Sequence, residues 1–105
     1  MSNEPTKIDE KGNKFWLNSR GQTHRDNDLP AIIRPDGYHV WYQNNQWHRD
    51  NDLPAKIWPN GMCEWWINGR FIKEKQCTKE EIEGYKKSYY LKKALKANRF
   101  ENLIK

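Results

Sequence analysis

The residues whose types could support metal binding or catalysis lie in a five-residue motif, His-Arg-Asp-Asn-Asp, that occurs twice. Carboxylates two residues apart resemble the start of a calcium-binding loop, but the glycine and the distal glutamate of such a loop are missing. Asp and Asn side chains also accept backbone N–H groups in turns, and Arg pairs with a nearby carboxylate. A stacked array needs the same turn in every copy, so we favour the structural role. The residues concerned are His24, Asp26 and Asp28, which recur as His48, Asp50 and Asp52.

Other candidates for chemistry are three histidines and a cysteine. His24, His39 and His48 could join aspartates around a transition metal, but a histidine packed on a tryptophan ring is the simpler interpretation. Cys63 could act as a nucleophile only with a base and an oxyanion hole. Its neighbour Glu64 points to the opposite side of a strand, so we expect a half-buried structural cysteine. We therefore expect no catalytic residues, no metal and no cofactor, which excludes an enzyme.

The dominant feature is an internal repeat. Residues 24–37 read HRDNDLPAIIRPDG and residues 48–61 read HRDNDLPAKIWPNG, so 11 of 14 positions are identical at an offset of 24. A degraded third copy begins with Gly12 and Trp16. Pro-Asp-Gly and Pro-Asn-Gly are turn sequences, and aromatic or β-branched segments follow them at residues 38–43 and 62–67. The sequence predicts a mainly β fold, an antiparallel β-meander of tandem hairpin repeats of about 24 residues with a C-terminal helix.

The chain divides into three parts on these patterns. Residues 1–11 are expected to be a flexible N-terminus, and residues 12–77 the β-hairpin repeat domain. Residues 78–105 are expected to form a basic C-terminal helix that packs on the sheet or extends from it. Thr78 and Glu81 form a capping box, which predicts a helix from about residue 79 to about residue 97.

Period-2 alternation assigns the strand residues to two faces. Positions that match between copies should form the core: Trp16, Trp41, Trp65, Ala31, Ala55, Ile33 and Ile57. Positions that change character between copies should face outward, where aromatic residues form a partner-binding surface. The residues predicted for that surface are Tyr42, Trp58, Trp66, Arg34 and Lys56.

The C-terminal segment carries most of the net charge of +5 and interleaves lysines with tyrosines. Lysines contact phosphates and tyrosines stack on bases, so this segment supports an alternative role in nucleic-acid binding. A solvated lysine face with tyrosines packed on the sheet is the interpretation we favour. The residues of the alternative site are Lys86, Lys87, Tyr90, Lys92, Lys93 and Lys96.

The sequence gives few signals of cellular location. The first residues have no apolar core of the kind that a signal peptide needs, and no apolar run approaches membrane-spanning length. The two cysteines form neither a disulfide framework nor a zinc pattern. We expect a chain that does not bind membranes and that works in a reducing cytoplasm.

The pattern P-[DN]-G-x-x-x-W-[YW]-x-N-[GN] followed by H-R-D-N-D-L-P-A resembles the MORN-like repeats of the YwqK antitoxin type. It is even more similar to the tandem W-Y-x-N-G-x-x-H-R repeats of phage and giant-virus proteins. The resemblance covers about residues 12–73 and implies antiparallel hairpins that act as binding or scaffolding surfaces, without catalytic residues. MORN glycines are sparse here, so lipid binding does not carry over. If phage-encoded, the chain is expected in the host cytoplasm.

These observations lead to one functional expectation and one alternative. We expect a non-enzymatic protein-binding module, of the kind that a phage uses to inhibit or redirect a host defence protein. The alternative is a nucleic-acid-binding protein that uses the C-terminal segment. Homo-oligomerisation stays open, because exposed edge strands invite pairing.

Overall fold

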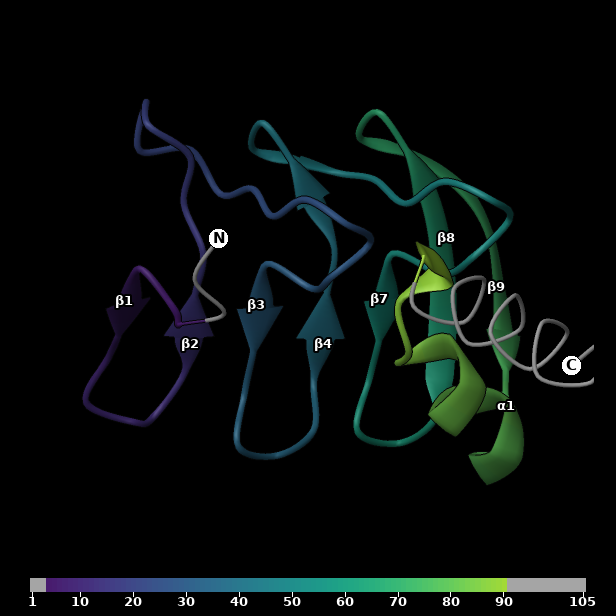
Figure 1. Cartoon of the computed structure of the whole chain (residues 1–105). Coiled ribbons are helices and arrows are strands. Elements are labelled where there is room, and N and C mark those ends of the chain that lie inside the picture. Colours follow the sequence, from purple (N-terminus) through teal and green to yellow (C-terminus); the bar gives the residue numbers. More distant parts are fainter. Residues whose placement is uncertain (1–3, 91–105) are drawn as a thin grey trace, which may run out of the picture.

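The computed structural model describes residues 4–90, which form a seven-stranded antiparallel sheet followed by one helix (Figure 1). The strand order is β1-β2-β3-β4-β7-β8-β9, and β5 pairs separately with β6. The strands are β1 Lys7–Ile8, β2 Lys14–Phe15, β3 Ile32–Ile33, β4 His39–Val40, β5 Tyr42–Gln43, β6 Gln46–Trp47, β7 Lys56–Ile57, β8 Met62–Ile67 and β9 Arg70–Gln76; α1 is Lys79–Tyr85. The prediction of a mainly β meander with a C-terminal helix is confirmed.

Tight turns with glycine at positive φ close the hairpins at the lower end of the sheet in Figure 1. The φ angles of Gly37 and Gly61 are 97° and 90°, a region open to glycine but costly for other residues. The amide of Gly37 donates to the Arg34 carbonyl and that of Gly61 to the Trp58 carbonyl, each over 3.0 Å. The turn residues therefore set the position of each hairpin as the sequence predicted.

The sheet begins earlier in the chain than we expected. Strand β1 pairs with β2 in the register Lys7 to Phe15, and a third turn is closed by the Gly12 amide on the Asp9 carbonyl over 3.1 Å. The assignment of residues 1–11 to a segment outside the sheet is therefore wrong for Lys7 and Ile8. A two-residue strand with one apolar residue gives too weak a period for detection.

Most of the buried core lies on one face of the sheet, which we call the helix face because α1 packs on it at the β8–β9 end (Figure 1). Tyr38, Val40 and Lys56 are buried on the opposite face. The core cluster consists of Trp41, Ala55, Ile57, Cys63, Trp65 and Cys77, against which Ile82 and Tyr85 of α1 pack. The three tryptophans predicted to share a face are buried, with exposed fractions of 7% for Trp16, 2% for Trp41 and 6% for Trp65. Large rings thus supply most of the buried apolar area, as the composition indicated.

The duplicated His-Arg-Asp-Asn-Asp motif forms a left-handed turn that joins neighbouring hairpins. Its backbone carbonyls accept the indole N–H groups of the core: Trp41 donates to the Asp28 carbonyl over 3.1 Å, and Trp65 to the Asp52 carbonyl over 3.0 Å. Asn and Asp tolerate positive φ better than other non-glycine residues. The φ angles are 63° at Asn27, 56° at Asp28, 64° at Asn51 and 55° at Asp52. The structural interpretation of the motif is confirmed.

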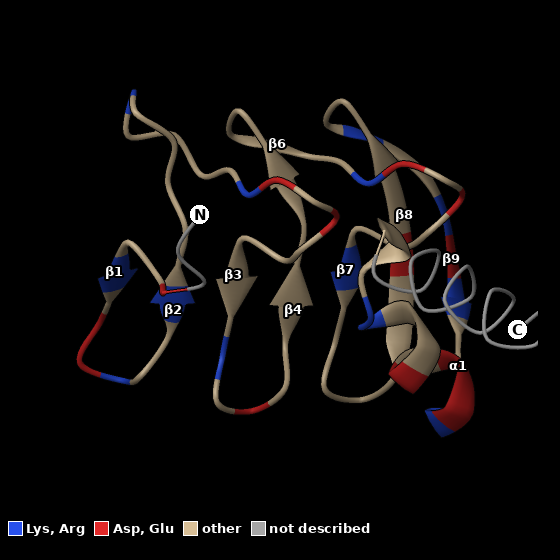
Figure 2. Ribbon diagram, viewed as in Figure 1, with Lys and Arg blue, Asp and Glu red and all other residues tan. Residues whose placement is uncertain are grey.

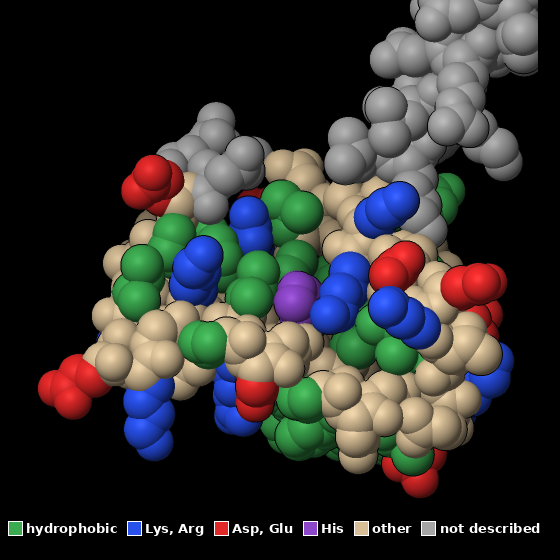
Figure 3. Space-filling view, turned by 90° about the horizontal axis from the view of Figure 1, so that it is seen from below, with side chains coloured by type: hydrophobic (Ala, Val, Ile, Leu, Met, Phe, Trp, Pro, Cys, Tyr) green, Lys and Arg blue, Asp and Glu red, His purple; other side chains and the backbone are tan. Residues whose placement is uncertain are grey.

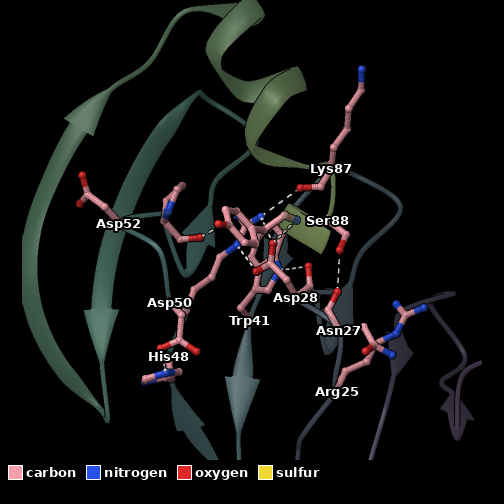
Figure 4. Close-up of polar contacts among 12 residues, drawn as sticks. Arg25, Asn27, Asp28, Trp41, His48, Asp50, Asp52, Lys87 and Ser88 are labelled. Atoms are coloured by element: carbon pink, nitrogen blue, oxygen red, sulfur yellow. Dashed lines mark hydrogen bonds and ion pairs between the residues drawn. The ribbon is translucent and has the colours of Figure 1, made fainter. Parts of the chain in front are cut away.

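Arg49 ties one copy of the motif to the other through Asp28, which is labelled near Trp41 in Figure 4. Its Nε and Nη2 atoms donate to the two carboxylate oxygens of Asp28 over 2.7 and 3.0 Å, and its Nη1 donates to the Pro54 carbonyl. The guanidinium carbon lies 3.9 Å from the centre of the Trp41 ring. Only 1% of the Arg49 side chain and 6% of the Asp28 side chain are exposed. A buried charge needs such complete pairing, because either partner alone is costly away from water.

An exposed form of this contact occurs one repeat further along the chain. Lys73, which lies 24 residues after Arg49, pairs with Asp52 over 3.5 Å and sits 4.8 Å above the Trp65 ring. Their side chains are 52% and 82% exposed. Strand β9 continues through the positions that correspond to the His-Arg-Asp-Asn-Asp turn of the two earlier copies. All seven of its residues are exposed.

Helix α1 begins as predicted. The Thr78 hydroxyl accepts the Glu81 amide over 3.1 Å, and the Glu81 carboxylate accepts the Thr78 amide over 3.0 Å. This capping box satisfies two of the free N–H groups of the first turn. Within residues 4–90, no helix has the length and apolar character required to cross a membrane.

The expectation of one continuous helix to residue 97 is wrong, because α1 ends at Tyr85. The chain then contacts the first turn: Ser88 donates to the Asn27 carbonyl and the Tyr89 amide donates to Asp28, each over 2.6 Å. Arg49 also donates to the Lys87 carbonyl over 3.2 Å. These tertiary contacts override helix propensity at the junction. Residues 91–97 of the predicted helix lie outside the described residues.

The offset of 24 residues supplies a matched pair for measuring the buried contact. Replacement Arg49→Ala leaves the Asp28 carboxylate buried and unpaired, and should lower the free energy of unfolding by about 3–5 kcal/mol. Replacement Lys73→Ala removes the exposed counterpart and should cost far less, because water screens that pair. Urea unfolding followed by tryptophan fluorescence measures both. Similar losses for the two variants would contradict the assignment of a special role to Arg49.

Candidate functional site

The residues predicted for partner binding gather on the sheet face opposite the helix face. Residues 56, 58, 64 and 66 alternate with the core positions, and Lys56 is the register partner of Glu64. We call this surface the aromatic face; it comprises Arg34, Tyr38, Tyr42, Trp47, Lys56, Trp58, Glu64, Trp66 and Phe71. All five predicted residues belong to it.

Ring contacts run across this face. The ring centres lie 4.3 Å apart for Tyr38 and Trp58, and 6.3 Å apart for Tyr42 and Trp47. Trp66 is in edge contact with Trp47 at 4.6 Å and with Phe71 at 5.5 Å. Aromatic pairs of this geometry add stability beyond their buried area, so the face is pre-organised.

Four members of the face were missed by the sequence prediction: Tyr38, Trp47, Glu64 and Phe71. Trp47 and Phe71 occupy equivalent positions 24 residues apart, directly after the Asn-Asn and Asn-Gly turns. They pair across their hairpins with Tyr42 and Trp66. Applying the 24-residue offset to the strand that follows each hairpin turn would have found both.

Lys56 lies on the predicted face but is not exposed. Only 7% of its surface is accessible, and its ammonium lies 3.4 Å from the centre of the Trp47 ring, 4.8 Å from that of Trp66 and 5.9 Å from that of Trp58. Burial lowers the pKa of Lys56, and the nearby Glu64 carboxylate opposes this shift. The prediction of an outward lysine is therefore wrong, because the rings attract the cation and the stem packs beneath them.

Glu64 anchors two of the half-buried tryptophans. Its two carboxylate oxygens accept the indole N–H groups of Trp58 and of Trp66, the latter over 3.0 Å. Indole N–H groups usually find such a partner when they leave water. Both indole N–H groups are therefore satisfied within the face, and the accessible part of these two rings is carbon.

The two copies of the repeat differ mainly on this face. The core pairs Ala31 and Ala55, Ile33 and Ile57, and Trp41 and Trp65 are identical, although His39 is replaced by Cys63 on the helix face. On the aromatic face every equivalent pair differs: Ile32 and Lys56, Arg34 and Trp58, Tyr38 and Met62, Val40 and Glu64, Tyr42 and Trp66, Trp47 and Phe71. The turns and core are thus common to both copies, and the side chains of this face are particular to each.

The repeated histidines support the turns. His48 Nε2 contacts the Asp50 carboxylate over 2.8 Å, and its Nδ1 accepts the Asn68 amide over 3.0 Å. His24 makes the equivalent pair of contacts with Asp26 and Asn44. With both ring nitrogens engaged, neither histidine is open to a metal ion. Among residues 4–90, no group of three or more His, Cys, Asp or Glu side chains is arranged to hold one.

The basic segment is only partly within the described residues. Lys87 and Tyr90 are exposed, Tyr90 to 55%, and Lys86 is half-buried. Lys92, Lys93 and Lys96 lie outside the described residues.

Comparison with protein-family models, with curated proteins and with solved structures finds no match for this chain. The functional argument therefore rests on the geometry of the aromatic face.

Cys63 has the environment of a structural thiol. It is fully buried beneath α1, and burial, followed by a hydrogen bond with Cys77, raises the pKa of its thiol to about 12. At neutral pH the thiol is protonated and unreactive.

We expect negligible labelling of native protein by a thiol reagent at pH 8, and labelling of both cysteines in denaturant. Rapid stoichiometric labelling of the native protein would contradict this environment.

Proposed function

We propose that this chain is a non-enzymatic protein-binding module and that the aromatic face is its contact surface. The observation that carries the proposal is the arrangement of Trp47, Trp58 and Trp66. They form a pre-organised group on the face opposite α1, and both indole N–H groups of Trp58 and Trp66 bind Glu64. Tryptophan, tyrosine and arginine are the residues that contribute most to protein–protein affinity.

The internal comparison of the repeats supports the same proposal. A repeat scaffold keeps its turns and core, and varies the surface that meets the partner. Here the varied positions are those of the aromatic face, whereas the Asp28–Arg49 contact and the buried tryptophans belong to the scaffold. The MORN-like pattern of the sequence agrees with a binding scaffold, and we propose a cytoplasmic protein partner, in line with a phage-type inhibitor or adaptor.

A double replacement on the aromatic face tests the proposal. Trp58→Ala with Trp66→Ala should reduce recovery of specific partners from a lysate by about tenfold or more, since such residues contribute about 2 kcal/mol or more each. Tyr90→Ala is the matched control, because it removes a ring that is 55% exposed outside this face. Quantitative pull-downs measure recovery, and circular dichroism checks the fold. Equal recovery by the folded double variant and the wild type would refute the proposal.

The alternative of nucleic-acid binding is favoured by one observation, the exposure of Lys87 and of the Tyr90 ring. It predicts binding to a single-stranded oligonucleotide at low salt that weakens steeply as salt is added. Lys86→Glu with Lys87→Glu should abolish that binding, as measured by fluorescence anisotropy. A flat titration at low salt would exclude the alternative.

A further inference from the structure

One row of side chains crosses the whole sheet on the side of the aromatic face. Each member is the register partner of the next, from one edge strand to the other. In order from β1 to β9 the row is Lys7, Phe15, Ile32, Val40, Lys56, Glu64 and Glu74. Its charges are segregated, because the cations lie on β1 and β7, and the carboxylates lie on β8 and β9.

The cations on this side of the sheet are held on aromatic rings. The Lys7 ammonium lies 5.5 Å from the centre of the Phe15 ring, and the Arg34 guanidinium carbon lies 4.5 Å from that of Tyr38. The third cation is Lys56, in contact with the tryptophans described above. None of the residues in strands β1 to β7 is Asp or Glu. Lys56 has the Glu64 carboxylate as its register partner, whereas Lys7 is paired with Phe15. The exposed cations Lys7 and Arg34 on an apolar floor complement a ligand that carries negative charge among apolar groups.

The opposite end of the row has the reverse character. Glu64 and Glu74 face each other across β8 and β9, and both oxygens of Glu64 are bound to indole N–H groups. Like charges directly opposite each other are unfavourable, so this edge repels further negative charge. Seen from the turn end of the sheet, hydrophobic side chains reach the surface with Lys and Arg side chains between them (Figure 3). In Figure 2, β1, β2 and β7 carry basic residues and no acidic ones, β8 carries one acidic residue, and β9 carries residues of both signs.

We propose that the partner presents carboxylate side chains among apolar ones, and that these carboxylates lie over the β1–β7 half of the aromatic face. This inference rests on the proposed function. Arg34 can bind a carboxylate through two N–H groups, and the exposed Lys7 ammonium supplies a second positive charge on this half of the face. Lys56 is buried beneath the tryptophan rings and does not contact the partner directly. The rings of Trp47, Trp66 and Phe71 supply the apolar contact area beside these charges.

A nucleic acid fits the same surface less well. Its phosphates carry negative charge along the whole strand, so some would meet Glu64 and Glu74. The rings of Trp66 and its neighbours also pack edge to face, with interplanar angles of 62° to Trp47 and 74° to Phe71, rather than lying open as a stack for bases. A protein segment can place carboxylates over one half only.

Blocked octapeptides of alternating leucine and glutamate, leucine and glutamine, or leucine and lysine test the charge preference. The readout is the indole N–H NMR signals of Trp58 and Trp66 during titration, which reports binding at this face. The variants are Lys7→Glu and Arg34→Glu, with Lys14→Glu as matched control. Lys14 is an exposed strand lysine whose register partners Ile8 and Ile33 lie on the helix face. Lys14→Glu therefore changes the net charge by the same amount as the other two substitutions, but on the helix face.

We expect the glutamate peptide to bind more tightly than the glutamine peptide, and the lysine peptide to bind least. Lys7→Glu and Arg34→Glu should each weaken binding of the glutamate peptide by about two- to fivefold, as for exposed ion pairs. The effect of each substitution should be smaller at high salt, because salt screens exposed charges. Lys14→Glu should leave binding of the glutamate peptide unchanged.

Several outcomes would overturn the inference. Equal binding of the glutamate and glutamine peptides would overturn the inference and leave the proposed function intact. The absence of binding by any peptide up to millimolar concentration would have the same consequence. A single-stranded oligonucleotide that binds this face and is weakened by the same two variants would reassign the surface to nucleic acid. Binding of the glutamate peptide that persists unchanged in the Trp58→Ala, Trp66→Ala variant, followed through the indole signal of Trp47, would refute both the inference and the proposed function.

Discussion

The buried guanidinium of Arg49 joins three segments that are distant in the sequence. It pairs with Asp28 of the preceding repeat, donates to the Pro54 carbonyl of its own repeat and donates to the Lys87 carbonyl in the segment after α1. Its plane also covers the Trp41 ring. A charge with 1% of its side chain exposed tolerates little displacement, because each lost contact leaves a polar group unsatisfied. The spacing of the blocks and the position of the C-terminal junction are therefore linked through one side chain.

The sheet face opposite the helix face keeps some structural residues, since Tyr38, Val40 and Lys56 are buried there, but Trp58 and Trp66 stay partly accessible. The turns satisfy the indole groups of Trp41 and Trp65 and fix the hairpins, and α1 packs on the helix face. Side chains such as Trp58 and Trp66 can then vary without loss of the turn geometry. Their local order comes from Glu64 and from each other, which limits the entropy lost when a partner binds. Rigid aromatic groups on a regular sheet are well suited to recognition.

Much of the fold could be predicted because its determinants are local. Asn68-Gly69 and Thr78 mark a hairpin and a helix start through their own chemistry, and the 24-residue offset aligns the tryptophans. The burial of Lys56 could not be predicted, because it depends on where the Trp47 ring lies after the hairpin folds. The end of α1 likewise depends on contacts with residues about 60 positions away, which no periodicity reveals. The composition of the aromatic face followed from alternation, whereas its internal contacts required the structure.

Strand β9 determines how the array ends. It occupies the place at which another His-Arg-Asp-Asn-Asp turn would lead into a further hairpin, and it carries Lys73, Glu74 and Lys75 in succession. A long strand at a sheet border is a template on which other chains can add, with filaments as the extreme result. Alternating charges along that border make the addition of another strand unfavourable. The residues that interrupt the repeat are thus also those that place alternating charges along the border strand.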